Sequence, residues 1–402
     1  MPLSALTLAI CLVSAQNATW QVQELGRGGE ATVTSDDNGR VFVTSHIPTQ
    51  LFASNNWGES FKLTKTFEES LGDMVALPLG GDKVMAVFMP PKINGLLTRL
   101  SVDGGLTWKE GTGIMGRPLD REWPAKHPSG AVFMVYSDGY IGGPDSKGIF
   151  IARSDDDGLS WKEVSRVDNE PAGVFAIDTH IAILDSGRIC VLWTTSTDKN
   201  TIDQYRVAVS DDLGVTFKHK QTIAEIKKTD GDTQERWMLG CLAGYGKTRL
   251  AVVYSRHQQV GGSNTLLTRV RISENGGETF GAEQLAVPQA YLQESVATYK
   301  RPGVNPAEVS HYIQCEPWAD YDTNGNLHLV WYDNRLGQVR RGSSRINTWQ
   351  TYHTILGNGK PSAISSPFQA NRPPMDFLSC NADSRYVYAA WTENDGATRG
   401  WA

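Results

Sequence analysis

Five short segments of the chain are rich in arginine, acidic, histidine and aromatic residues. They are Asp120-Arg121-Glu122-Trp123, Glu235-Arg236-Trp237, residues 311–318, Tyr332-Asp333-Asn334-Arg335 and residues 372–376. A guanidinium group binds a carboxylate or sulfate group through two parallel hydrogen bonds. Arg121, Arg236, Arg335 and Arg372 therefore predict a site for an acidic ligand.

Three tryptophans lie in these segments: Trp123, Trp237 and Trp318. An indole ring presents a broad apolar face, and such faces beside arginines favour a sugar that carries an acidic group. We therefore expect an acidic oligo- or polysaccharide as the partner. The alternative is structural, because each arginine could pair with the acidic residue next to it while each tryptophan fills the protein core.

Catalysis at such a site would need a proton donor and a base or nucleophile. Asp333 and Glu316 are the best candidate carboxyl groups, and Tyr312 precedes Glu316 by four residues, on the same face of a strand if no bulge intervenes. This set favours hydrolysis of a glycosidic bond. The alternatives are a lyase, with His257 and Tyr312 as base and acid beside Arg335, and binding without catalysis. The sequence shows no metal-ligand spacing and no phosphate-binding loop, so we expect no cofactor.

A repeated turn predicts the scaffold that positions these segments. In each copy an Asn or Asp side chain can accept hydrogen bonds from its own turn, and a glycine adopts positive φ. The copies are Ser54-Asn56-Gly58-Ser60-Phe61, Ser101-Asp103-Gly105-Thr107-Trp108, Ser154-Asp156-Gly158-Ser160-Trp161, Ser210-Asp212-Gly214-Thr216-Phe217 and Ser273-Asn275-Gly277-Thr279-Phe280. Their starts lie 47, 53, 56 and 63 residues apart, which is typical of four-stranded propeller blades with variable loops.

Seven apolar and β-branched runs give the number of blades. They are residues 41–45, 84–88, 132–136, 189–193, 250–254, 327–331 and 387–391. We therefore predict an all-β fold, a seven-bladed propeller of four-stranded antiparallel blades, with six blades as the alternative. Residues 19–25 are predicted to be the outer strand of the last blade, so that three strands from the C-terminus and one from the N-terminus close the ring.

The repeated turn resembles the Asp box of sialidases and related β-propellers. This resemblance implies that the turns lie on the outer rim, away from the active site. It also implies an exo-sialidase-like glycoside hydrolase with a tyrosine nucleophile activated by a glutamate, a role that Tyr312 and Glu316 would fill. The family's Arg-Ile-Pro string has no counterpart except His46-Ile47-Pro48, and Asp73 is the candidate for its general acid.

The remaining expectations concern the location and state of the chain. Residues 1–15 resemble a secretory signal, which leaves residues 16–402 as one secreted, monomeric propeller domain. A net charge of −6 disfavours nucleic acid as a partner, and the mature segment contains no apolar stretch long enough to span a membrane. Cys190, Cys241, Cys315 and Cys380 are predicted to be buried thiols, with two disulfides as the alternative.

Overall fold

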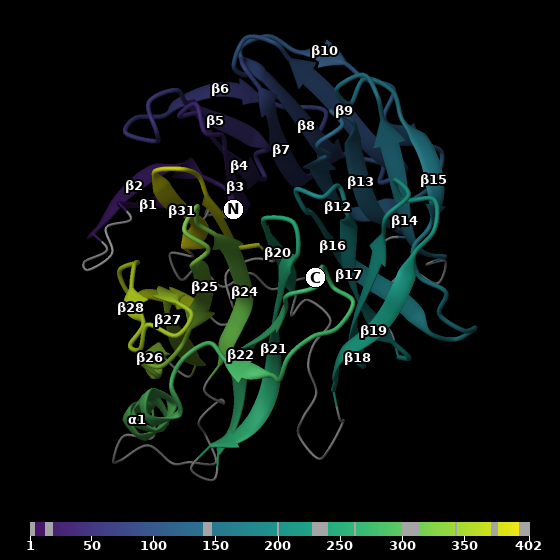
Figure 1. The fold of residues 1–402 in the computed structure, drawn as a ribbon. Helices are drawn as coiled ribbons and strands as arrows, with labels where there is room; N and C mark the ends of the chain where they lie inside the picture. The colour runs from purple at the N-terminus through teal and green to yellow at the C-terminus, as the bar shows by residue number, and fades with distance from the viewer. Residues whose placement is uncertain are drawn as a thin grey trace.

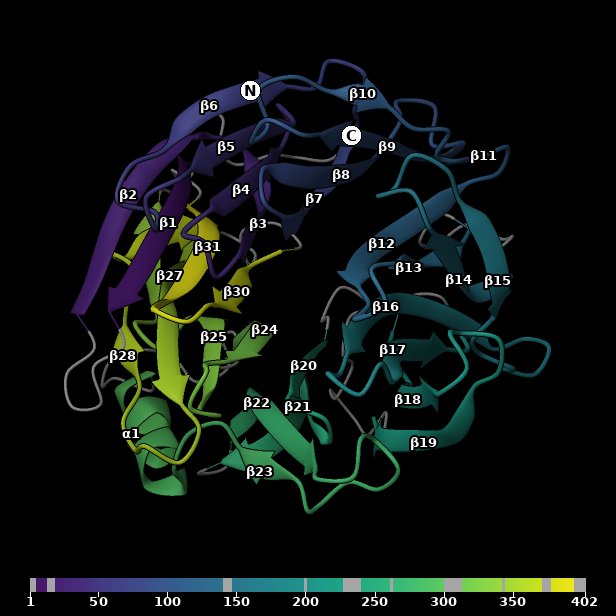
Figure 2. The ribbon, with the colours of Figure 1, turned by 45° about the horizontal axis from the view of Figure 1, so that its top comes forward.

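The computed structural model describes residues 5–12, 19–139, 147–198, 201–226, 240–260, 263–299, 313–341, 344–370 and 377–393. Seven antiparallel sheets surround a common axis (Figures 1 and 2). The predicted seven-bladed β-propeller is therefore confirmed. No helix among these residues is both long and apolar enough to cross a membrane.

In blades one to four the strands follow the sequence from the axis to the rim. The first two blades consist of β3 (Gly29–Ser35), β4 (Val41–His46), β5 (Gln50–Ser54), β6 (Lys62–Thr66), then β7 (Gly72–Gly80), β8 (Lys83–Met89), β9 (Gly95–Ser101) and β10 (Lys109–Glu110), with β11 (Ile114–Met115) also paired to β9. The next two consist of β12 (Leu119–Lys126), β13 (Val132–Asp138), β14 (Gly148–Ser154), β15 (Lys162–Arg166), then β16 (Phe175–Ile183), β17 (Ile189–Ser196), β18 (Gln204–Ser210) and β19 (Lys218–Glu225).

Blades five and six carry additions to the four-stranded plan. Blade five consists of β20 (Cys241–Tyr245), β21 (Arg249–Val260), β22 (Ser263–Ser273) and β23 (Gln284–Leu285), and the helix α1 (Gln289–Tyr299) follows it. Blade six consists of β24 (Gln314–Tyr321), β25 (Leu327–Asp333), β27 (Ser344–Ile355) and β28 (Ser362–Ala363), with β26 (Gln338–Arg341) and β29 (Phe368–Ala370) also paired to β27.

Blade seven contains both ends of the described chain. Its order from the axis is β30 (Ser379–Ala382), β31 (Tyr386–Glu393), β1 (Ala5–Leu12) and β2 (Thr19–Arg27). Two strands therefore come from each end, and our expectation of three C-terminal strands and one N-terminal strand is wrong. The third strand, β1, lies in the segment that we interpreted as an export signal, and each of its eight residues pairs with a residue of β31.

The seven predicted apolar runs are the second strands of the blades. Every residue of β13 and of β17 is buried, because neighbouring blades cover both faces of a second strand. Such a strand needs apolar residues on both faces and therefore loses the usual alternation of polar and apolar side chains. Trp193, Trp331 and Trp391 stand at equivalent places in three of these strands and are fully buried.

The repeated turns form the local hydrogen bonds that their sequence predicts. In the third copy, Ser154 Oγ donates to Asp156 Oδ1 at 2.8 Å and accepts from the backbone N–H of Gly158 at 2.8 Å. Asp156 Oδ1 also accepts from the N–H of Ser160, and Gly158 has φ of 88°. The turns join third to fourth strands, so they lie on the face where the innermost strands end. We call this the lower face, and the face where the innermost strands begin the upper face.

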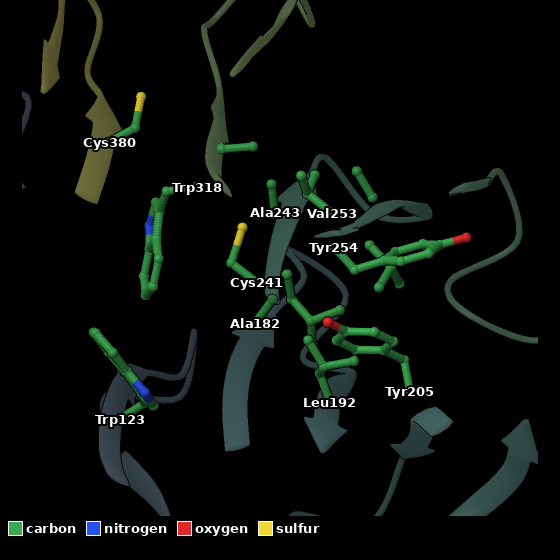
Figure 3. Close-up of a cluster of buried hydrophobic side chains, with 14 of the residues drawn as sticks. Trp123, Ala182, Leu192, Tyr205, Cys241, Ala243, Val253, Tyr254, Trp318 and Cys380 are labelled. Atoms are coloured by element: carbon green, nitrogen blue, oxygen red, sulfur yellow. The ribbon is translucent and has the colours of Figure 1, made fainter. Parts of the chain in front are cut away.

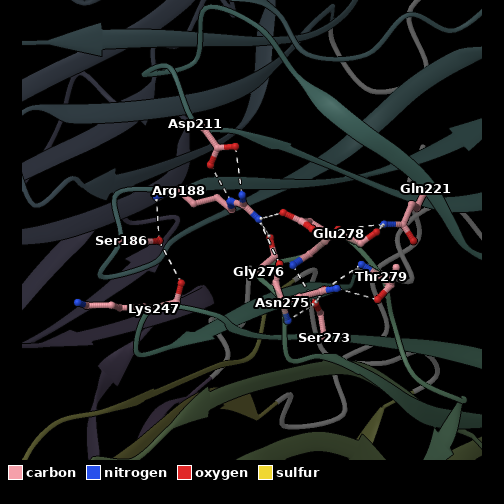
Figure 4. Close-up of polar contacts among 11 residues, drawn as sticks. Ser186, Arg188, Asp211, Gln221, Lys247, Ser273, Asn275, Gly276, Glu278 and Thr279 are labelled. Atoms are coloured by element: carbon pink, nitrogen blue, oxygen red, sulfur yellow. Dashed lines mark hydrogen bonds and ion pairs between the residues drawn. The ribbon is translucent and has the colours of Figure 1, made fainter.

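Neighbouring blades are linked to one another through these turns. Gln221 Nε2, on the outer strand of blade four, donates to the carbonyl of Gly277 in the turn of blade five at 3.0 Å. Arg188 donates hydrogen bonds to Asp211 of blade four and to Glu278 of blade five (Figure 4). In the same way, Gln23 Nε2 of blade seven donates to the carbonyl of Gly58 in the turn of blade one.

The charged turns predict an acid-dependent stability. Burial alone would raise the pKa of Asp212, but hydrogen bonds from Thr216 and Ser210 lower it to about 2. A carboxyl group whose pKa falls on folding stabilises the fold above its unfolded pKa, and this contribution is lost as the pH falls through the folded pKa. We expect Asp212→Asn to make thermal stability less pH-dependent between about pH 4 and pH 2.

Asn275 provides the matched control, because it makes the same turn bonds without a charge. Asn275→Asp should make the stability more pH-dependent in the same range. If the melting temperatures of wild type and Asp212→Asn fall by the same amount from pH 4 to pH 2, this account of the turns is wrong.

Cys190, Cys241, Cys315 and Cys380 are buried thiols, as we predicted. Burial raises the pKa of Cys190 to about 12 and raises the pKa of Cys315 well above its usual value. Both groups are therefore neutral and unreactive, since the thiolate is the nucleophile.

Candidate functional site

Five innermost strands carry a β-bulge near their start, at the upper face. In each bulge one charged residue has a positive φ, between 47° and 57°. These bulge residues are Glu30, Asp73, Arg121, Asp178 and Glu316, in blades one, two, three, four and six. A bulge redirects the side chain of its extra residue and interrupts the strand pairing. The repeated bulges therefore place five charged groups at the same level of the propeller.

Aromatic rings fill the axis directly below this level. The rings of Trp123 and Trp318 lie 4.8 Å apart between centroids, although they belong to blades three and six, and they point toward each other (Figure 3). His180 packs against both at 5.0 and 4.8 Å, and Phe377 packs edge-on against Trp123. We call Trp123, His180, Trp318 and Phe377 the axial plug.

The plug fixes the place of three of the bulge residues. Arg121, Asp178 and Glu316 each precede a plug ring by two residues, which is about 6–7 Å along a strand. Since Trp123, His180 and Trp318 contact one another, the three charged groups stand above one common floor. All three are at least nine-tenths buried.

Arg121 and Asp178 form an ion pair across two blades. Arg121 Nε lies 3.5 Å from Asp178 Oδ1, and the guanidinium carbon lies 4.9 Å from the ring centroid of Phe377. Thr194 Oγ1 donates to Asp178 Oδ2 at 3.1 Å. The cation and the hydroxyl donor both favour the ionised form of Asp178.

A second group of polar residues stands beside these, in blades one and two. His46 Nδ1 lies 2.9 Å from Glu30 Oε2 and 3.6 Å from Asp73 Oδ1, and the N–H of Asp73 donates to this nitrogen at 3.2 Å. Gly72 makes the approach possible, because a Cβ there would lie 1.4 Å from Nδ1. Burial, and next the charge of Glu30, raise the pKa of Asp73 well above its usual value.

Glu122 follows Arg121 in the bulge of blade three and is 2 % exposed. Neither of its carboxyl oxygens has a hydrogen-bond partner among the described residues. Burial, and next the charge of Asp73, raise the pKa of Glu122 well above its usual value. The two carboxyl groups therefore influence each other across the boundary between blades two and three.

The structure gives Asp333 and Arg335 an internal role. Arg335 donates to both oxygens of Asp333, and Trp331 Nε1 donates to the same carboxylate at 3.1 Å. The guanidinium group also lies between the rings of Tyr291 and Tyr352, at 4.6 and 4.0 Å. This is the local pairing that we named as the structural alternative, and the catalytic role of Asp333 and the binding role of Arg335 stay predictions.

The other predicted residues divide into three groups. Arg121 and Glu316 reach the axis, while Trp123 and Trp318 form the plug rather than an open stacking surface. His257 lies half-buried near the end of β21, away from the plug contacts. Tyr312, Arg236, Trp237 and Arg372 lie outside the described residues, so their roles remain predictions.

Our sequence analysis missed Glu30, Asp178 and the His46 cluster as members of one site. A usable signal was present, because Arg121-x-Trp123, Asp178-x-His180 and Glu316-x-Trp318 share a charged residue two positions before an aromatic one in the innermost strand. A charged residue inside an otherwise buried strand indicates a specific environment.

A groove of about 500 Å³ lies elsewhere, at the rim between blades seven and one. It is lined by residues such as Glu24, Arg27, Phe52 and Leu63. These belong to outer and third strands, so the groove is separate from the charged groups on the axis.

No family model and no curated protein matches this chain. Among solved structures it is similar to a protein of unknown function from Dyadobacter fermentans (14% identity, TM-score 0.48, 91% of this chain and 94% of that one). It is also similar to the GH93 α-L-arabinofuranosidase of Fusarium graminearum (12%, 0.47, 79% and 91%) and to a PL25 ulvan lyase (8%, 0.49, 85% and 82%). The activities in these names belong to those proteins, since every TM-score here lies below 0.5.

Proposed function

We propose that this protein is a glycoside hydrolase that binds a glycan on the upper face and cleaves it with carboxyl groups on the axis. The observation that carries the proposal is the set of five charged residues with positive φ at one level of the propeller. Each such residue costs about 1–3 kcal/mol, and such strain collects at functional sites. Packing of the blades does not explain why a charged residue has this positive φ in five of the innermost strands.

Asp178 and Glu316 are the proposed catalytic pair. Glycosidases use two carboxyl groups, one as proton donor and one as base or nucleophile. Asp178, which is paired with Arg121, suits the role of the ionised group, and Glu316 suits that of the proton donor. Burial raises the pKa of Tyr332 well above its usual value, so the phenol beside Glu316 stays neutral.

The substrate proposal follows the sialidase-like reading of the sequence. Arg121 is the described guanidinium on the axis, and Arg236 and Arg372 would complete a carboxylate-binding set for an acidic sugar. The lyase alternative stays a prediction, and Arg335, which it would use, is paired with Asp333. Export is a separate proposal, and it is tested by whether residues 1–15 are still present in the purified protein.

The products of incubation with glycans test this function. A panel of sialosides, uronate-containing polysaccharides and neutral polysaccharides should include one substrate that releases new reducing ends without ultraviolet absorbance from a conjugated double bond. An unsaturated product would make the protein a lyase. Retention of a glycan without new ends would make it a binding protein, and both outcomes contradict the hydrolase.

A further inference from the structure

We propose that Glu30, His46 and Asp73 bind one divalent cation, with Zn²⁺ as the best match, at the junction of blades one and two. This site goes beyond the proposed function, because it does not depend on whether the protein cleaves glycans. The ligand atoms would be Oε2 of Glu30, Nδ1 of His46 and Oδ1 of Asp73, which all lie within 4.8 Å of one another.

The separations fit a common ion. Nδ1 lies 2.9 Å from the Glu30 oxygen and 3.6 Å from the Asp73 oxygen. Ligand atoms at about 2.0–2.2 Å from a tetrahedral Zn²⁺ lie roughly 3–4 Å apart. One imidazole with two carboxylates is a mixed nitrogen and oxygen set, which suits Zn²⁺ better than Ca²⁺ or Mg²⁺.

The lone pairs of this cluster also face one another. His46 Nδ1 faces the oxygens of Glu30 and Asp73, and an ionised carboxylate has only acceptor sites. The contact of Nδ1 with the N–H of Asp73, at 3.2 Å, would be given up when the lone pair binds a cation. Among the described residues, the donor nearest to Glu30 Oε2 is His46 Nδ1, and only when that nitrogen is protonated. The 2.9 Å contact needs a positive charge between the two atoms, which is a proton on His46 in the metal-free protein and the cation in the metal-bound one.

Glu122 supplies a second and independent observation. Its carboxyl group is buried, both oxygens lack a donor in the described part of the chain, and the charged group that acts on it most strongly is Asp73. Removing a carboxylate from water without a partner is costly. A cation held by Asp73 would also lower the electrostatic cost of ionising Glu122.

The backbone supports the ligands from two blades. Glu30 and Asp73 occupy bulges of β3 and β7, and His46 ends β4. Gly72 leaves room for the imidazole ring. A cation here would join blade one to blade two, so its binding should raise the melting temperature as well as appear in the metal content.

The test uses the full chain after treatment with EDTA and dialysis. Titration with Zn²⁺ by calorimetry should show one site per chain, with matching metal content and a higher melting temperature. His46→Ala and the nearly isosteric Glu30→Gln should each weaken binding at least tenfold, and Glu30→Gln keeps the proposal testable if the alanine variant does not fold. His219→Ala, which removes an exposed histidine on β19, should bind as wild type does.

The proposal is overturned if neither Zn²⁺ nor Mn²⁺ binds, or if binding survives in both His46→Ala and Glu30→Gln. Glycan cleavage is measured in parallel on the same preparations. Hydrolysis of a glycan without cation binding would support the proposed function and contradict this site. Cation binding without hydrolysis would support this site and contradict the proposed function.

Discussion

Asp178→Asn and Glu316→Gln will each lower kcat on the glycan substrate by about 10²–10⁴-fold, the usual contribution of a general acid or base. Both variants keep the size of the side chain and remove its acid–base chemistry. Asn at position 178 can still accept the hydrogen bond that Thr194 donates to the carboxylate. KM should change less than kcat, since the carboxyl groups act on the reacting bond.

The matched control is Asp211→Asn. Asp211 also pairs with an arginine, since Arg188 Nε donates to it at 2.7 Å, but it lies in a turn on the lower face. Its loss should leave kcat unchanged. Circular dichroism and melting curves show whether each variant is folded, and a folded Asp178→Asn or Glu316→Gln enzyme with wild-type kcat would remove that residue from the mechanism.

Leu6→Ala will destabilise the protein by about 2–5 kcal/mol, as expected for a fully buried leucine. Leu6 lies on β1, is 0 % exposed and pairs with Thr392 of β31. Val22→Ala on the adjacent strand β2 is the control, because Val22 is 50 % exposed and its truncation should cost about 0.5 kcal/mol or less. Urea denaturation of both variants measures the difference.

This experiment also decides between two roles of residues 1–15. If an export signal is cleaved there, the mature protein lacks Leu6, and Leu6→Ala will not change its stability. Mass spectrometry of the purified protein shows directly which residues remain. Equal stability of Leu6→Ala and wild type with the N-terminus intact would contradict the placement of β1 in blade seven.

The parts of the fold that local chemistry determines were predictable from sequence. The Ser154 turn closes through hydrogen bonds within five residues, and second strands such as β17 are apolar throughout because both faces are buried. The N-terminus shows where composition alone is insufficient. The apolar run at residues 5–12 suits either a propeller strand or the core of an export signal, and the pairing of β1 with β31 depends on residues distant in sequence.

The candidate site was predictable only in part, for a related reason. Arg121 and Glu316 stand out as charged residues in apolar surroundings, but bulges are backbone features that residue types do not specify. Arg335 has the same residue type as Arg121, yet its carboxylate partner lies two positions away in the chain. Whether an arginine pairs locally or reaches another blade depends on contacts between residues distant in sequence.

The composition of blade seven has a consequence for how the protein is made. Ala5 pairs with Glu393. Blades one to six can therefore form in order during synthesis, whereas β1 cannot pair with β31 until β31 has left the ribosome. Contacts between such distant residues slow folding, because a long loop must close first. In concentrated refolding mixtures β1 of one molecule can pair with β31 of another, which favours exchange of strands between copies.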